Sequence, residues 1–160
     1  MSTNNQLGEL KVITAETESS FWQPLPGHGF ASVRVSPNFI KMDQSCSFGT
    51  QMLYPGNYVR EHNHPNNEEI LHFIEGSGKA YLDGEEFILQ PGVTVYIGKG
   101  RNHKLVNDSD AELRWVWFMT PNGLENFFEQ AGMPRTVGEE TPEPFERSAT
   151  VKKIEENTVF

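Results

Sequence analysis

Short apolar and β-branched segments follow one another over residues 31–120, and each one ends at Gly, Pro, Asn or Asp. Residues 79–82 and 85–89 show the pattern best, because they flank Asp83-Gly84. An Asp-Gly pair supplies the positive φ angles of a tight hairpin turn. Many short strands at this spacing predict an all-β antiparallel sandwich or barrel.

The sequence changes character after this region. Leu124, Phe127 and Phe128 have helical spacing and are followed by Gly132, which predicts a short helix over about 123–131. Residues 133–160 are acidic and rich in proline, and we expect an extended, solvated tail without chemistry. The length of 160 residues predicts a single domain over 1–160, with its barrel core at about 31–120.

Charge and composition exclude several classes of function. The formal net charge of −9 disfavours nucleic acids and anionic membrane surfaces as partners. Residues 1–10 lack a basic segment followed by an apolar one, so we expect a cytoplasmic protein. Cys46 is the single cysteine, which excludes an internal disulfide and a cysteine-based zinc cluster.

Three of the five histidines have the spacing that a metal site needs. His62 and His64 are two residues apart, so on a strand they point to the same face. Glu69 follows a turn, and His103 comes after the hairpin, where an antiparallel sheet can bring it opposite the pair. Three imidazoles and a carboxylate suit a divalent transition metal such as Fe, Mn, Co, Ni, Cu or Zn better than Ca or Mg.

The wider spacing around these residues resembles the two motifs of the cupin superfamily. The matching patterns are Gly56-x5-His62-x-His64-x4-Glu69-x6-Gly76 and Gly92-x5-Gly98-x-Gly100-x2-His103-x3-Asn107. Gly98 departs from the second motif, which usually carries proline there, but this position shapes a turn and binds no metal. The resemblance implies a small jelly-roll barrel, a monocupin, that holds a metal through residues matching His62, His64, Glu69 and His103.

Strand alternation predicts which side chains face the barrel interior. If Glu69 points inward, then Leu71 and Phe73 do so too. The outer face then carries Ile70, His72 and Ile74, and we expect it to pack on another segment of the chain or on a second subunit in a homodimer. Glu68 is the competing carboxylate, but the spacing to Gly76 favours Glu69.

The same parity argument places Tyr58 and Arg60 inside, on the face of His62. Arg60 has the planar fork that holds a carboxylate or enolate. Four further aromatic residues are candidates for lining a substrate pocket or filling a core: Tyr81, Tyr96, Trp115 and Trp117. The orientation of the two tryptophans stays open, because a one-residue slip reverses it. Phe127 and Phe128 are expected to plug one end of the barrel.

These residues support three hypotheses about function. The first is a dioxygenase for a small oxygen-rich or aromatic substrate, similar to bacterial quercetinase-type cupins, with iron(II) as the expected metal. Its catalytic candidates are Glu69, Tyr58, Arg60 and Tyr81. The second is a non-redox isomerase, decarboxylase, lyase or cyclase in which the metal is a Lewis acid and Tyr58, Tyr81 or Tyr96 moves a proton. The third is a module that only binds a small molecule.

Overall fold

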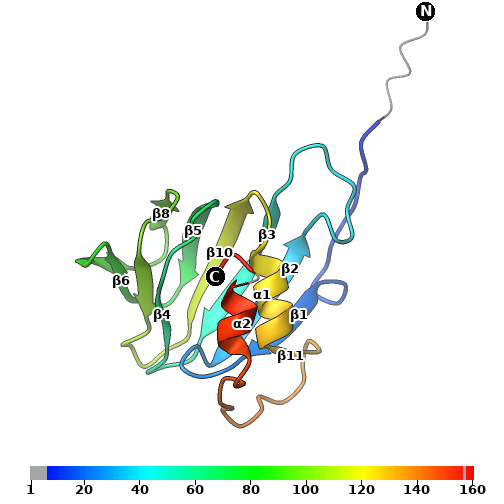
Figure 1. The fold of residues 1–160 in the computed structure, drawn as a ribbon. Coiled ribbons are helices and arrows are strands. Elements are labelled where there is room, and N and C mark those ends of the chain that lie inside the picture. The colour runs from blue at the N-terminus through cyan, green and yellow to red at the C-terminus, as the bar shows by residue number, and fades with distance from the viewer. Residues whose placement is uncertain (1–6, 157) are drawn as a thin grey trace, which may run out of the picture.

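Two antiparallel sheets face each other and form the body of the molecule (Figure 1). The computed structural model describes residues 7–156 and 158–160, without the side chain of residue 152. The larger sheet has the order β11-β1-β2-β3-β10-β5-β8, and the smaller one has the order β4-β9-β6-β7. The strands are β1 (Ser19–Gln23), β2 (Gly29–Val35), β3 (Ser47–Leu53), β4 (Tyr58–His62), β5 (Glu68–Glu75), β6 (Gly78–Leu82), β7 (Glu85–Leu89), β8 (Thr94–Ile97), β9 (His103–Val106), β10 (Leu113–Thr120) and β11 (Met133–Pro134). The predicted all-β antiparallel barrel is therefore confirmed.

The turns follow the local sequence. Strands β6 and β7 form the expected hairpin, with Asp83 and Gly84 at φ angles of 49° and 86°. Both angles are positive, as a type I′ turn requires. At Gly49, in the middle of β3, a Cβ atom would lie 1.8 Å from the carbonyl oxygen of Ser32. Glycine at this position therefore lets β2 and β3 approach each other.

Alternate residues of the facing strands fill the space between the sheets. Strand β10 alternates strictly between buried and half-buried side chains, and its Trp115 and Trp117 are 1% and 0% exposed. The ring of Trp115 lies 5.7 Å from that of Phe73, and Trp117 lies 5.5 Å from Phe128. Both tryptophans thus point inward, which answers the question that the sequence left open.

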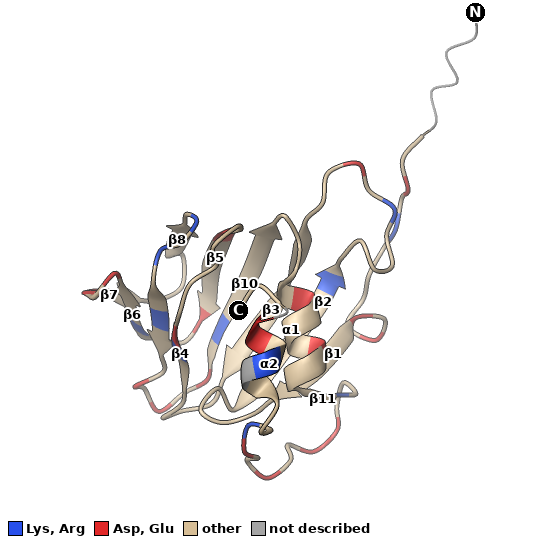
Figure 2. Cartoon of the chain, viewed as in Figure 1, with Lys and Arg blue, Asp and Glu red and all other residues tan. Residues whose placement is uncertain are grey.

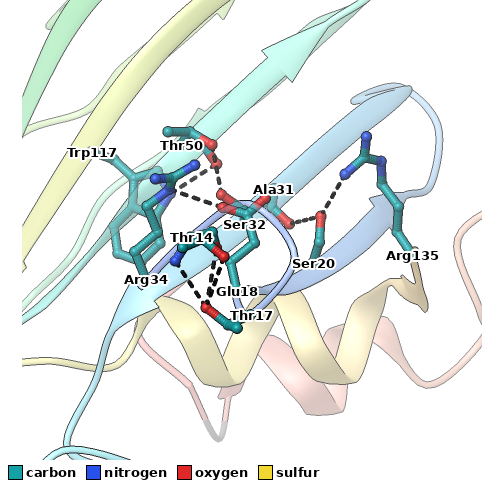
Figure 3. A network of polar contacts seen from close by, with 10 residues as sticks. All are labelled: Thr14, Thr17, Glu18, Ser20, Ala31, Ser32, Arg34, Thr50, Trp117 and Arg135. Carbon is teal, nitrogen blue, oxygen red and sulfur yellow. Dashed lines mark hydrogen bonds and ion pairs between the residues drawn. The ribbon is translucent and has the colours of Figure 1, made fainter. Parts of the chain in front are cut away.

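The larger sheet is also covered on its outer side. Trp22, Phe30 and Met52 form a small apolar cluster there, and the guanidinium carbon of Arg135 lies 3.8 Å from the ring centre of Phe30. Arg135 also donates a hydrogen bond to Ser20 Oγ at 3.1 Å. Figure 3 shows this bond within a polar network that joins β1, β2, β3 and β10. The chain after β11 therefore fixes the sheet from outside.

Two helices lie side by side at one end of the barrel (Figure 1). Helix α1 (Leu124–Ala131) confirms the sequence prediction, and it buries Leu124, Phe127 and Phe128 against the core. Helix α2 (Val151–Glu156) lies in the region that we expected to be an extended, solvated tail. That expectation is wrong for this part of the chain, because Val151 is 4% exposed and Ile154 packs against the core.

Charged residues lie mainly on loops, strand ends and the helices (Figure 2). Within the described residues, no helix is long and apolar enough to span a bilayer.

Candidate metal centre

Strand pairing brings the three histidines of the motif together. His62 at the end of β4 pairs with His103 at the start of β9, and their rings lie 4.1 Å apart. His64 follows β4 by two residues, and its ring lies 4.9 Å from His62 and 5.1 Å from His103. One ring nitrogen of each histidine lies within 4.8 Å of the others. The expected meeting of His103 with the His62 and His64 pair is therefore observed.

Backbone carbonyls fix the orientation of all three rings. The Nδ1 atom of His62 lies 2.8 Å from the carbonyl oxygen of Arg60, and that of His103 lies 3.0 Å from the carbonyl oxygen of Arg101. The Nδ1 atom of His64 bonds in the same way to the carbonyl oxygen of Val159. A carbonyl accepts only from an N–H, so each Nδ1 carries a proton, and in the neutral form of each ring Nε2 keeps its lone pair. Metal-binding histidines are commonly held in this way.

The free nitrogens fit a metal ion. The Nε2 atoms of His64 and His103 are buried and have no hydrogen-bond partner. A buried polar atom without a partner costs free energy, so these two atoms need an explanation. Three imidazole nitrogens and a carboxylate are a suitable donor set for a divalent transition metal, which would satisfy both orphaned atoms. The residues present therefore fit such an ion.

The carboxylate of the site comes from β5. Glu69 is 4% exposed, and its Oε2 atom lies 3.3 Å from the Nε2 atoms of His64 and His103. Glu68 points the other way and accepts a hydrogen bond from the Tyr96 hydroxyl at 2.8 Å. Leu71 and Phe73 face inward with Glu69, as strand alternation predicts. The structure thus places Glu69, and not Glu68, beside the histidines.

Burial and mutual contacts set the charges in this cluster. Burial lowers the pKa of His62 well below its ordinary value, and the neighbouring His103 and His64 lower it further. Burial also opposes charge on His64 and on Glu69, but their mutual contact outweighs it. The pKa of His64 is raised, and contacts with His103 and His64 hold that of Glu69 at about 2. His62 is therefore neutral and Glu69 ionised at neutral pH, which are the forms that bind metal ions.

Arg60 reaches the edge of the site. Burial, together with the nearby Arg147, lowers the pKa of Arg60 to about 10, so the guanidinium is still charged at neutral pH. Arg60 forms an ion pair with Glu155 of α2, and its guanidinium carbon lies 4.9 Å from the ring centre of Phe160. A cavity of about 520 Å³ borders this region, with Arg60, His62, Asn67, Glu155 and Phe160 in its wall.

Tyr58 is not in the interior, which corrects the parity argument. Val59 pairs with Leu105 and His62 pairs with His103, so three residue steps in β4 face two steps in β9. This extra residue is a β-bulge, and a bulge reverses the face to which the preceding residues point. Tyr58 is accordingly 38% exposed.

The other tyrosine candidates also lie on outer faces. Tyr81 donates a hydrogen bond to Glu86 at 2.9 Å, and the ammonium of Lys104 lies 5.8 Å from its ring and 4.9 Å from that of Tyr58. Tyr96 is 64% exposed. The structure therefore gives none of these three tyrosines contact with the histidines, and they are no longer candidates for moving a proton there.

Two histidines lie apart from the cluster. His72 is on the outer face of β5, where its Nδ1 atom lies 2.8 Å from Thr94 Oγ1. His28 lies beside Tyr54, with 5.0 Å between the ring centres. Neither residue belongs to the group of histidines that could hold a metal.

Sequence reasoning missed the residues that close the site. Phe160 stacks on His62, Val159 bonds to His64, and Glu155 pairs with both Arg60 and Arg147. The one signal for them is weak: Val151 and Ile154 have the spacing of a short amphipathic helix.

Comparison with known proteins agrees with this architecture. Residues 49–119 match the family described as Cupin domain. The tetracenomycin polyketide synthase protein TcmJ of Streptomyces glaucescens is 27% identical over 124 residues, which are 76% of this chain and 82% of that protein. The polyketide synthase CurC of Streptomyces cyaneus is 34% identical over 73 residues, 46% of this chain and 47% of its own length.

A solved structure shows the same fold. It is an uncharacterised conserved protein from Klebsiella pneumoniae with a double-stranded β-helix domain. It superposes with a TM-score of 0.55 at 18% identity and covers 71% of this chain and 91% of the other. Residues 49–119 therefore match the cupin domain family, and the fold and the spacing of the three histidines agree with that match.

Proposed function

We propose that this cupin is a metal-dependent enzyme, and specifically a dioxygenase that acts on a small, oxygen-rich aromatic molecule. His62, His64, Glu69 and His103 hold the metal in this proposal. The observation that carries it is the pair of buried Nε2 atoms, of His64 and His103, that make no hydrogen bond and lie 3.3 Å from the Glu69 carboxylate.

The chain's own residues supply the rest of the site. A bound divalent transition metal, with iron(II) as our first expectation, would polarise a bidentate oxygen ligand and, if redox-active, mediate electron transfer to O2. Glu69 is an ionised carboxylate and accepts the proton of a substrate hydroxyl. Arg60 holds the resulting anion. The apolar ring of Phe127, which packs against the core, limits the access of water.

A second candidate is non-redox chemistry, in which the metal stabilises an enolate during cyclisation or isomerisation. The names of the two Streptomyces relatives favour it, because both are polyketide synthase proteins. Polyketides are rich in enolisable carbonyl groups, which a Lewis acid activates. The outward position of the three tyrosines leaves Glu69 as the proton acceptor in this version too.

We further propose that the enzyme is cytoplasmic and forms a homodimer. Ile70, Ile74 and Tyr96 are 38%, 48% and 64% exposed on β5 and its neighbour β8. Large apolar side chains that share an outer face are typical of a subunit interface.

Oxygen uptake by the metal-loaded protein tests the proposed function. The assay compares flavonols, diketones and catechols as substrates. Dioxygenase activity predicts substrate-dependent O2 consumption that His103→Ala abolishes and His72→Ala preserves. Conversion of a substrate without O2 consumption would overturn the dioxygenase in favour of the non-redox enzyme. Binding of a substrate without any conversion would overturn both the dioxygenase and the non-redox enzyme.

A further inference from the structure

The end of the described chain lies across the opening of the barrel, next to the histidines. In Figure 1 it lies between the helices and the smaller sheet. We call residues 158–160 the closing segment. It follows α2, and its contacts are with β4, with α1 and with His64.

The ring of Phe160 is stacked on both faces. Its centre lies 4.0 Å from the His62 ring at an interplanar angle of 11°, and 3.9 Å from the Phe127 ring at 7°. The guanidinium of Arg60 is close to the same ring. Two parallel rings about 8 Å apart, with a cation beside them, form a slot for one flat aromatic ring, since stacked rings lie roughly 3.5–4 Å apart. One wall of this slot is His62 itself.

The slot also connects two spaces. Phe160 and Arg60 both line the cavity of about 520 Å³ described above and a smaller one of about 40 Å³ that reaches Phe127 and Phe128. The larger volume is in the range of small-molecule sites. The wall of the larger cavity contains His62 and the closing segment, but not His64 or His103.

Packing of Val159 and Phe160 against the core, together with one hydrogen bond from His64, holds the closing segment in place. The carbonyl oxygen of Val159 accepts the hydrogen bond from His64. The side chain of Val159 packs directly against Gly123, where a Cβ atom on residue 123 would lie only 2.3 Å from Val159 Cγ1. The preceding helix is held by Glu155, which pairs with Arg60 and Arg147. These three side chains are 19%, 30% and 26% exposed, and partly exposed ion pairs of this kind hold weakly. The contacts can therefore be exchanged for those of a ligand.

We propose that Phe160 occupies the position of the substrate, and that a planar aromatic ring bearing an acidic oxygen displaces it from between His62 and Phe127. The inference rests on the proposed function for the identity of the site. It adds the class of ligand, the walls of its subsite and the segment that must move. Arg60, released from Phe160 and Glu155, then pairs with the acidic group of the ligand.

Binding of 3-hydroxy-2-naphthoate, a flat fluorescent carboxylate, tests the proposal on the full chain. If the closing segment occupies the slot nine-tenths of the time, Phe160→Ala tightens binding about tenfold, because only the open fraction binds. Phe160→Leu, which keeps apolar bulk, should give a smaller gain. Phe127→Ala combined with Phe160→Ala should lose the gain, since one wall is missing. Phe87→Ala is the control, because Phe87 is an exposed residue of β7.

A second measurement needs no ligand. Diethyl pyrocarbonate modifies accessible imidazoles, and mass spectrometry reads each histidine separately. His62 should react several-fold faster in Phe160→Ala than in the unaltered protein, whereas His72 on the outer face should react equally in both. Unchanged reactivity of His62 would overturn the proposal. So would weaker binding of the naphthoate to Phe160→Ala, because Phe160 would then be a fixed wall of the site.

The two proposals fail in different ways. Both measurements are made on metal-free protein, in EDTA, and are repeated after metal loading. If the naphthoate displaces Phe160 but no turnover is found, the proposed function is wrong and the aromatic slot stands. If turnover is found and Phe160→Ala changes neither binding nor the reactivity of His62, the slot is wrong and the enzyme stands.

Discussion

Asn107 stabilises the strand that carries His103, and its replacement by alanine should destabilise the whole domain. The side chain is fully buried. Its Nδ2 atom donates to the carbonyl oxygens of Leu53 at 2.9 Å and Ala111 at 2.8 Å. Its Oδ1 atom accepts from the backbone N–H and the hydroxyl of Ser109 at 3.2 Å and 2.8 Å. One side chain thus joins the end of β3 to the turn between β9 and β10.

The size of the expected loss in stability follows from the hydrogen-bonding groups that alanine leaves without a partner. The carbonyl of Leu53 loses its Asn107 donor in a buried position, which costs about 1–3 kcal/mol. The other three hydrogen bonds of Asn107, to Ala111 and to the N–H and hydroxyl of Ser109, cost roughly 0.5–1 kcal/mol each. We therefore expect Asn107→Ala to lower the free energy of unfolding by about 2.5–6 kcal/mol. For a chain of this length, that loss lowers Tm by roughly 5–24 °C.

Equilibrium unfolding in urea, followed by tryptophan fluorescence, measures this loss. Trp22, Trp115 and Trp117 are all buried, so their emission reports on the folded state. Ser109→Ala is the matched control, because it removes one hydroxyl and keeps the bonds of Asn107 to Leu53 and Ala111. It should cost about 1 kcal/mol. A loss below about 1 kcal/mol for Asn107→Ala, or equal losses in the two variants, would show that the buried hydrogen bonds of Asn107 do not stabilise the domain.

Two further changes test the core and the outer face. Gly49→Ala should destabilise the domain by about 1–3 kcal/mol or more, because its Cβ would overlap the Ser32 carbonyl in the centre of the sheet; thermal unfolding checks this, and an unchanged Tm would contradict it. Ile74→Asp, which alters an exposed side chain on β5, should leave the fold intact and convert the proposed homodimer to a monomer. Light scattering measures the mass, and an unaltered protein that is already monomeric at micromolar concentration would end the dimer hypothesis.

Local sequence patterns predicted those features of the site that are set by residues close together in the sequence. Asp83-Gly84 specified the hairpin, and alternation along β5 separated the inward Glu69 from the outward Ile70. The spacing of His62, His64 and His103 predicted their meeting, because antiparallel pairing follows from a succession of short strands.

The rest depends on features that local patterns do not encode. The bulge in β4 reverses the face of Tyr58, and it is visible only in the pairing of β4 with β9. The closing segment depends on contacts over long separations: Arg60 and Glu155 are 95 residues apart in the sequence. The acidic character of residues 133–160 predicted a solvated tail, whereas Ile154, Val159 and Phe160 pack its end against the core of the barrel.

Elemental analysis tests whether His62, His64, His103 and Glu69 hold a metal ion. The protein is purified without a metal-chelating tag, and His62→Ala, His103→Ala and the control His72→Ala are prepared alongside it. We expect about one Fe, Mn, Ni, Co, Cu or Zn per chain in the unaltered protein and in His72→Ala, and loss of metal in His62→Ala and His103→Ala. Full metal retention in both His62→Ala and His103→Ala would contradict it.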